Sequence, residues 1–205
     1  MAILSQTNTS ILNTLLTAPD GHVVYEISTP TKIFGGSTTT ILRYGIVIAS
    51  IEWHQLSSDR LAFEGRQGSI HDLFPRSGTF SSSRIYTASS GRSFKWKDHG
   101  ELYCVTADSK VNLATYNRVS FARFRNKKSA LYINSIGVDM MDALVVTWVI
   151  MEKYAKDGRR GDEDLGGDGD GGGGGGGDGG WGGDGGGGGD GGGGGGGGDG
   201  GGGAS

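Results

Sequence analysis

The sequence predicts a mostly β fold: a closed antiparallel β-barrel of about ten to twelve strands around a buried C-terminal helix, followed by a disordered tail. Three observations predict it. Short segments of alternating apolar and polar residues, separated by turn residues, recur through residues 22–135. One later segment, residues 143–151, is apolar on every side of a helix. Finally, 32 of the 43 glycines lie after Arg160.

Ten segments have the composition of strands. They are rich in β-branched and aromatic residues, and turn pairs such as Tyr44-Gly45 and Glu64-Gly65 stand between them. A chain of this size must pair or cover its sheet edges, so this hairpin spacing predicts a barrel or a sandwich. The predicted strands are residues 23–28, 39–43, 46–53, 60–64, 84–87, 93–97, 101–105, 111–116, 120–125 and 130–133.

The last predicted element is a helix over residues 138–154. Asp139 and Asp142 lie in its first turns and Lys153 and Lys156 near its end, the order of charges that a helix dipole favours. Its middle, residues 143–151, is apolar all round, and only the sheet can enclose it. Because Val, Ile and Trp also favour strands, an extended structure is the alternative for this segment.

Composition divides the chain into an N-terminal extension (1–19), a barrel domain (20–157) and a tail rich in Gly and Asp (158–205). The tail has too few apolar residues to offset the entropy of folding, so we expect it to be a flexible coil. The first 160 residues hold all 19 Lys and Arg and 13 acids, a formal charge of +6, whereas nine acids follow them. The tail either competes with an anionic ligand of the body or only keeps the protein soluble.

Compartment and membrane signals are weak. The single cysteine, Cys104, excludes an intrachain disulfide, which fits a reducing compartment. No Lys or Arg precedes the apolar cluster near the N-terminus, so we predict no signal peptide. The longest apolar stretch is far shorter than the roughly 20 residues that span a bilayer. We therefore predict an intracellular, cytoplasmic protein without a transmembrane segment.

The strongest candidate site is the basic run over residues 118–128. In a strand over residues 120–125, two arginines project from one face and two lysines follow in the next turn. Guanidinium groups bind phosphate in a bidentate manner, so the run predicts an anionic ligand such as a phospholipid headgroup. The alternative is a solvated sheet face that binds nothing. The candidate ligand residues are Arg118, Arg123, Arg125, Lys127 and Lys128.

Catalytic, metal and cofactor motifs are absent from the sequence. There is no Gly-x-Ser-x-Gly elbow, Walker loop or dinucleotide motif, and the four histidines lack metal-ligand spacing. The aspartates of the tail do not fit calcium-binding repeats. A body charge of only +6 and the lack of a known motif disfavour nucleic acid. We therefore predict a non-catalytic binding module without cofactor or metal; the alternatives are a protein-partner scaffold with a flexible acidic tail and an enzyme of unknown reaction.

Five segments resemble an uncharacterised domain family of basidiomycete fungi, associated here with the tubby C-terminal-like superfamily. That superfamily includes phospholipid scramblases and the plant LURP-one-related proteins. The resemblance covers residues 20–157 and implies a twelve-stranded barrel around a central C-terminal helix. Tubby domains bind phosphoinositides through basic residues, but none of those residues aligns with a specific position here, and a fold implies no activity. The segments are residues 25–29, 51–54, 93–96, 119–124 and 142–149 with Glu152 and Lys153.

Overall fold

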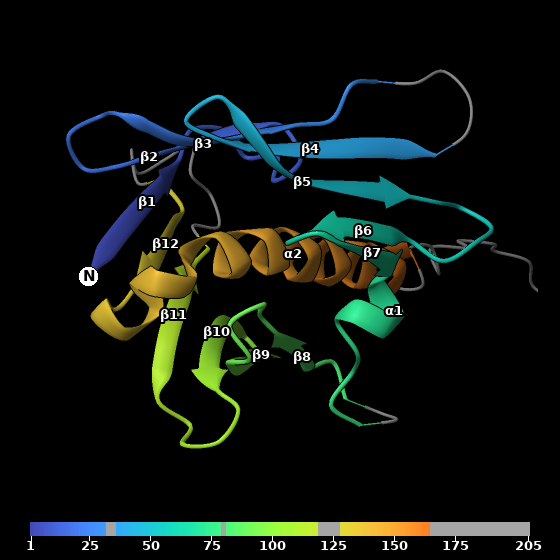
Figure 1. The fold of residues 1–205 in the computed structure, drawn as a ribbon. Coiled ribbons are helices and arrows are strands. Elements are labelled where there is room, and N and C mark those ends of the chain that lie inside the picture. The colour runs from blue at the N-terminus through green and yellow to red at the C-terminus, as the bar shows by residue number, and fades with distance from the viewer. Residues whose placement is uncertain (32–35, 79–80, 119–127, 165–205) are drawn as a thin grey trace, which may run out of the picture. The chain divides into compact units, whose positions relative to one another are not determined.

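The computed structural model describes residues 1–31, 36–78, 81–118 and 128–164. In this part of the chain, twelve strands form one sheet that curls around a long helix (Figure 1). The helices are α1 (Ile70–Leu73), a 3-10 helix (Ser135–Met140) and α2 (Met141–Asp164). The strands are β1 (Ala2–Gln6), β2 (Thr14–Thr17), β3 (Val23–Ser28), β4 (Ser37–Arg43), β5 (Ile46–Trp53), β6 (Arg60–Phe63), β7 (Arg66–Ser69), β8 (Arg84–Thr87), β9 (Ser93–His99), β10 (Glu101–Thr106), β11 (Asn112–Asn117) and β12 (Ala130–Ile133).

Neighbours in the sheet are neighbours in the sequence with one exception, and all strand pairs are antiparallel. The order is β7-β6-β5-β4-β3-β2-β1-β12-β11-β10-β9-β8. The exception is the pair of β1 with β12, in which Ile3 lies opposite Tyr132 and Leu4 opposite Leu131. Two meanders are therefore joined side by side where the first strand meets the last.

The helix α2 lies inside the curled sheet, as its all-round apolar pattern predicts (Figure 1). Every side chain of residues 143–151 is buried, and the segment is helical rather than extended. The helix begins at Met141, after the 3-10 helix, and continues to Asp164, beyond the predicted end near residue 154. The fold is thus mostly β with a buried C-terminal helix.

Two contacts orient α2 within the sheet. Trp96 of β9 donates a hydrogen bond from Nε1 to Oγ1 of Thr147 at 2.8 Å, and Thr147 Oγ1 donates to the Ala143 carbonyl at 2.6 Å. The ring of Trp148 packs edge-on against that of Tyr116 of β11, with their centroids 4.9 Å apart. Because the buried hydroxyl both accepts and donates, the polar residue within the apolar run is satisfied.

Residues 1–19, predicted to be an N-terminal extension, are part of the sheet. They contain β1 and β2, which lie in its middle between β3 and β12. Leu4 and Leu16 belong to the core, and the side-chain oxygen of Gln6 accepts a hydrogen bond from the Tyr116 hydroxyl at 2.8 Å. Their sequences, Ala-Ile-Leu-Ser-Gln and Thr-Leu-Leu-Thr, do not alternate between apolar and polar residues, so they carry no strand pattern.

The sheet is not closed, so the predicted closed barrel is wrong in this respect. Among the described residues β7 and β8 are edge strands that do not pair with each other. Ser69, the last residue of β7, caps α1, so a helix and not a hairpin follows β7. The segment after α1 then covers the β8 edge: the Ile85 N–H donates to the Pro75 carbonyl at 2.9 Å, and Arg76 forms a bridge with Arg84. We call the line between β7 and β8 the seam.

The two ends of the curled sheet carry different connections. We call the end at which α2 begins the N-side rim; it holds the 3-10 helix and the β2–β3, β4–β5, β6–β7, β8–β9 and β10–β11 connections. The opposite end, the C-side rim, holds the β1–β2, β5–β6 and β9–β10 connections, and β3 and β11 end there while β4 and β12 begin there.

At Gly137 the backbone of the 3-10 helix lies close to the sheet, and the variant Gly137→Ala tests how much this close contact matters for stability. A Cβ at this position would lie 2.7 Å from the carbonyl oxygen of Leu113 and 2.9 Å from a methyl carbon of Ile133. We expect Gly137→Ala to lower the free energy of unfolding by about 1–3 kcal/mol, measured by chemical denaturation, because the backbone cannot move aside. The control is Gly158→Ala in α2, where a Cβ meets nothing within 4 Å. It should raise stability by about 0.5–1 kcal/mol, and equal effects would contradict this account.

Candidate functional site

Two of the five basic residues predicted to bind an anion are described. Arg118 follows β11, and Lys128, whose side chain is exposed, precedes β12. Asn117 of β11 is paired with Ala130 of β12, so the segment between the strands leaves and rejoins the sheet at adjacent positions on the C-side rim. The predicted strand 120–125 lies outside the described residues, and so do Arg123, Arg125 and Lys127.

The guanidinium of Arg118 is held between two carboxylates. Its Nε donates to Glu152 Oε2 at 2.7 Å, and one Nη donates to Asp98 Oδ1 at 3.2 Å. Glu152 of α2 is buried, and Lys156 Nζ lies 3.8 Å from its other oxygen. Burial alone would lower the pKa of Arg118, but the two carboxylates outweigh burial and raise that pKa above its ordinary value. Arg118 therefore compensates the buried charge of Glu152. It also anchors the start of the basic run, residues 118–128, to α2 and β9, and we call this run the basic segment.

The variant Arg118→Ala tests this anchor. It leaves the buried carboxylate of Glu152 with weaker compensation, so we expect the free energy of unfolding to fall by about 3–5 kcal/mol in urea denaturation. Combining it with Glu152→Gln removes the uncompensated charge as well. The double variant should then be less destabilised than the sum of the two single variants, and strict additivity would show that the two residues do not interact.

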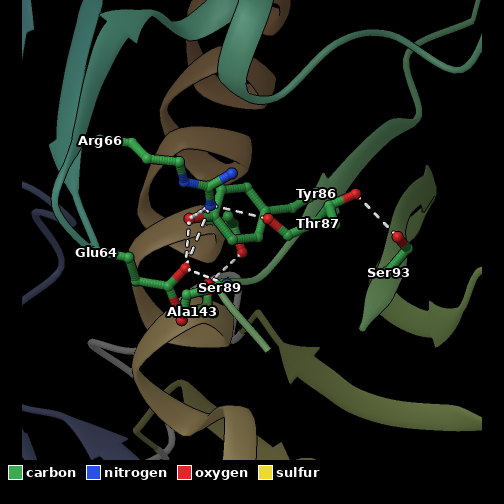
Figure 2. A network of polar contacts seen from close by, with 8 residues as sticks. Glu64, Arg66, Tyr86, Thr87, Ser89, Ser93 and Ala143 are labelled. Carbon is green, nitrogen blue, oxygen red and sulfur yellow. Dashed lines mark hydrogen bonds and ion pairs between the residues drawn. The ribbon is translucent and has the colours of Figure 1, made fainter. Parts of the chain in front are cut away.

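A polar network crosses the seam near the N-side rim (Figure 2). One Nη of Arg66, the first residue of β7, donates to the Tyr86 hydroxyl at 2.6 Å, to the Thr87 carbonyl at 2.8 Å and to Glu64 at 3.2 Å. Glu64 Oε2 also accepts from the Ser89 N–H at 2.7 Å and from the Tyr86 hydroxyl at 3.2 Å. Side chains thus connect β7 to β8, where backbone hydrogen bonds do not. We call these five residues the seam clamp.

The charges and protonation states of the seam clamp stabilise the contact between β7 and β8. Burial, followed by the Glu64 carboxylate, raises the pKa of Tyr86, so its hydroxyl stays protonated and donates to Glu64. The Arg66 guanidinium lies 5.1 Å from the centre of the Tyr86 ring, a cation–π distance. This network was not predicted from the sequence. The one signal for it is the turn Glu64-Gly65, which brings Arg66 back along Glu64 at the start of β7.

A second set of contacts ties the seam to α2 near the C-side rim. Arg84 of β8 is buried; it donates to the Phe74 carbonyl at 2.7 Å, and its guanidinium lies 4.8 Å from the ring centre of Tyr154. The Tyr154 hydroxyl donates to Asp59 Oδ2 at 3.0 Å. Burial lowers the pKa of Arg84. These contacts join α2, β8 and the β5–β6 connection.

The first turn of α2 is fixed to β3 and β4. Asp142 Oδ1 accepts from the Tyr25 hydroxyl at 2.5 Å, and one Nη of Arg43 donates to both Asp142 oxygens at 3.0 Å. A carboxylate is also favoured near a helix N-terminus. Asp142 was predicted at this terminus from the sequence, but its partners Tyr25 and Arg43 were not.

Three hydroxyls in these contacts predict instability at high pH. Burial is the largest cause that raises the pKa of Tyr25, Tyr86 and Tyr154, and neighbouring carboxylates raise it further. The folded protein therefore holds these protons more tightly than the unfolded chain, whose tyrosines titrate near pH 10. We expect this stabilisation to be complete below about pH 10 and to be lost as the pH rises further. Absorbance of tyrosinate at increasing pH should follow unfolding measured by circular dichroism; full ionisation of these tyrosines in the folded state would contradict the prediction.

Metal, thiol and membrane features can be stated for the described residues. In that part of the chain no group of three or more His, Cys, Asp and Glu could hold a metal ion. Cys104 is buried as expected, and burial raises the pKa of its thiol. None of the described helices combines the length and apolar character needed to cross a bilayer.

Comparison with known proteins identifies the family of this chain. A profile of the Family of unknown function (DUF6593) matches residues 9–157, which run from the β1–β2 connection into α2. The chain belongs to this family. The family description assigns no activity, and no curated protein matches the chain. An X-ray structure of a protein from Arabidopsis thaliana is similar at 12% identity and a TM-score of 0.42, over 75% of this chain and 91% of that one.

Proposed function

We propose that the chain is a non-catalytic binding module that takes a phosphate-bearing anionic ligand, a lipid headgroup, at the C-side rim. The observation that carries the proposal is the basic segment, which has five Lys and Arg within residues 118–128. Its two ends lie side by side because Asn117 pairs with Ala130. Several cations tethered between adjacent strands suit a ligand with several phosphate oxygens.

The packing of the interior supports a site on the rim rather than inside the sheet. The buried side chains of residues 143–151 fill the space that the sheet surrounds. Within the segment, Arg118 is bonded to Glu152 and Asp98 and so serves as an anchor, whereas the exposed Lys128 is available to an anion. Arg118 thus anchors the start of the segment, and we assign ligand binding to its other basic residues.

Kinship with the tubby C-terminal-like superfamily is part of the proposal. A twelve-stranded antiparallel sheet around a C-terminal helix supports it, although the seam departs from the closed barrel that the resemblance implies. The resemblance to a basidiomycete fungal family is its other support.

We also propose a cytoplasmic location, for which the single buried Cys104 is the support.

A protein-partner scaffold is the second candidate function. One observation favours it: exposed apolar side chains gather on the N-side rim, away from the basic segment. Residues 161–205, with nine acids, would then act as a spacer or as a competitor for the basic segment. These residues lie largely outside the described part of the chain.

Vesicle flotation tests the headgroup proposal. The protein is mixed with phosphatidylcholine vesicles that contain or lack a phosphoinositide, and we expect binding to the former. A basic side chain near an anionic surface contributes about 1 kcal/mol, so Arg123→Ala with Arg125→Ala should weaken binding roughly 30-fold.

The matched control is Arg92→Ala with Lys95→Ala, which removes the same charge outside the basic segment. This control should bind nearly as well as the wild type. Equal loss in both double variants would reduce the effect to net charge, and wild-type protein that ignores the phosphoinositide would refute the headgroup proposal.

A further inference from the structure

Exposed apolar side chains are concentrated at one end of the molecule. In the described part of the chain, eight of the ten large apolar side chains that are exposed lie at the N-side rim. The other two are Leu56 in the β5–β6 connection and Tyr132 on β12. Contiguous exposed apolar patches mark interaction sites, whereas scattered apolar residues do not, and three of the eight lie together at the β4–β5 hairpin. The eight are Met1, Val23, Tyr44, Ile46, Val47, Val111, Ile136 and Val138.

The strand register explains why residues so far apart in the sequence share this end. Thr17 lies opposite Val23 and Tyr25 opposite Arg43, so the β2–β3 and β4–β5 turns emerge together. The N-terminus and the 3-10 helix lie at the same end, because β1 and β12 are antiparallel (Figure 1). The rim is thus a composite surface around the start of α2.

The tip of the β4–β5 hairpin carries three of these exposed side chains within four residues. Tyr44, Ile46 and Val47 are 67%, 71% and 59% exposed. Tyr44 has φ 48° and Gly45 has φ 80°, a two-residue turn in which Asn or Asp before Gly is the favoured choice. A tyrosine there carries a conformational cost that folding does not require. Its exposed ring lies 5.5 Å from the Arg43 guanidinium, and Tyr and Arg are the residues that dominate binding interfaces.

The charges around the tip cancel. Arg43 is paired with Asp142 and Arg66 with Glu64, so much of the charge is neutralised within the molecule. Neither sign dominates, and two such rims can approach each other without repulsion. An anionic bilayer surface, in contrast, gains no attraction from a rim without excess positive charge. The described charged side chains at this rim are five acids and four bases: Asp20, Glu64, Asp108, Asp139, Asp142, Arg43, Arg66, Arg92 and Lys110.

We propose that the N-side rim binds a second copy of this chain, rim to rim, in a two-fold dimer centred on the β4–β5 hairpin tips. In a two-fold contact the same patch serves both partners, so the patch must be self-complementary. An apolar surface with internally paired charges meets this requirement, and the basic segment on the opposite rim does not. In the dimer each Tyr44 ring packs on the apolar side chains of the other rim, and both C-side rims remain free.

Sedimentation velocity on the full-length protein over a wide range of concentrations tests the dimer. Wild-type protein is expected to pass from monomer to dimer as its concentration rises. Tyr44→Asn removes the exposed ring and leaves a residue that suits the turn, so folding is preserved. Together with Ile46→Ser it should raise the dimer dissociation constant about tenfold or more.

The control for the dimer is Leu56→Ser, which removes a fully exposed apolar side chain from the C-side rim. It should leave the dissociation constant unchanged, and so should Arg123→Ala with Arg125→Ala, which separates this proposal from headgroup binding. Wild-type protein that is monomeric at every concentration overturns the dimer, as does equal weakening by Leu56→Ser. Monomeric wild-type protein that floats with pure phosphatidylcholine vesicles also overturns it and assigns the rim to a bilayer.

Discussion

The structure depends on enclosing a helix that is apolar on every side. Residues 143–151 of α2 would present apolar surface to water in all directions, and one face of a flat sheet covers only part of it. A twelve-stranded sheet that curls around the helix, with side-chain contacts across the seam, buries every side chain of this segment. The polar Thr147 does not oppose this burial, because Trp96 and the Ala143 carbonyl satisfy its hydroxyl.

Most of the sheet could be predicted from the sequence. Apolar and polar residues alternate along most of its strands, and glycine-containing turns separate many of them. The bounds of β3, β5, β8 and β12 agree with the prediction. The missed strands are those without such signals: apolar and polar residues do not alternate in β1 and β2, and β7 consists of Arg, Gln, Gly and Ser and has no apolar face. Its pairing with β6 is set by the turn at Glu64 and Gly65. Closure was mispredicted because a sequence shows where strands lie and not whether the two edge strands, here β7 and β8, pair with each other.

The polar sites were harder to predict than the fold because their members are distant in sequence. Arg118 could be identified as part of a basic run, but its carboxylate partners Asp98 and Glu152 are 20 and 34 residues away. A charged side chain has the same sequence signature whether it is paired or free. The seam clamp shows the same limit, since Glu64 and Tyr86 are 22 residues apart and meet only because the sheet curls.

The pairing of β1 with β12 has a consequence for how this chain is made in the cell. The strand that precedes all others must find the last one, and the helix that fills the interior follows both. During translation the intervening strands therefore emerge without their core. Such long-range topology folds slowly and leaves apolar strands open to aggregation. Chaperones that hold nascent chains, and slow, cool expression, should therefore determine how much of this protein reaches its native state.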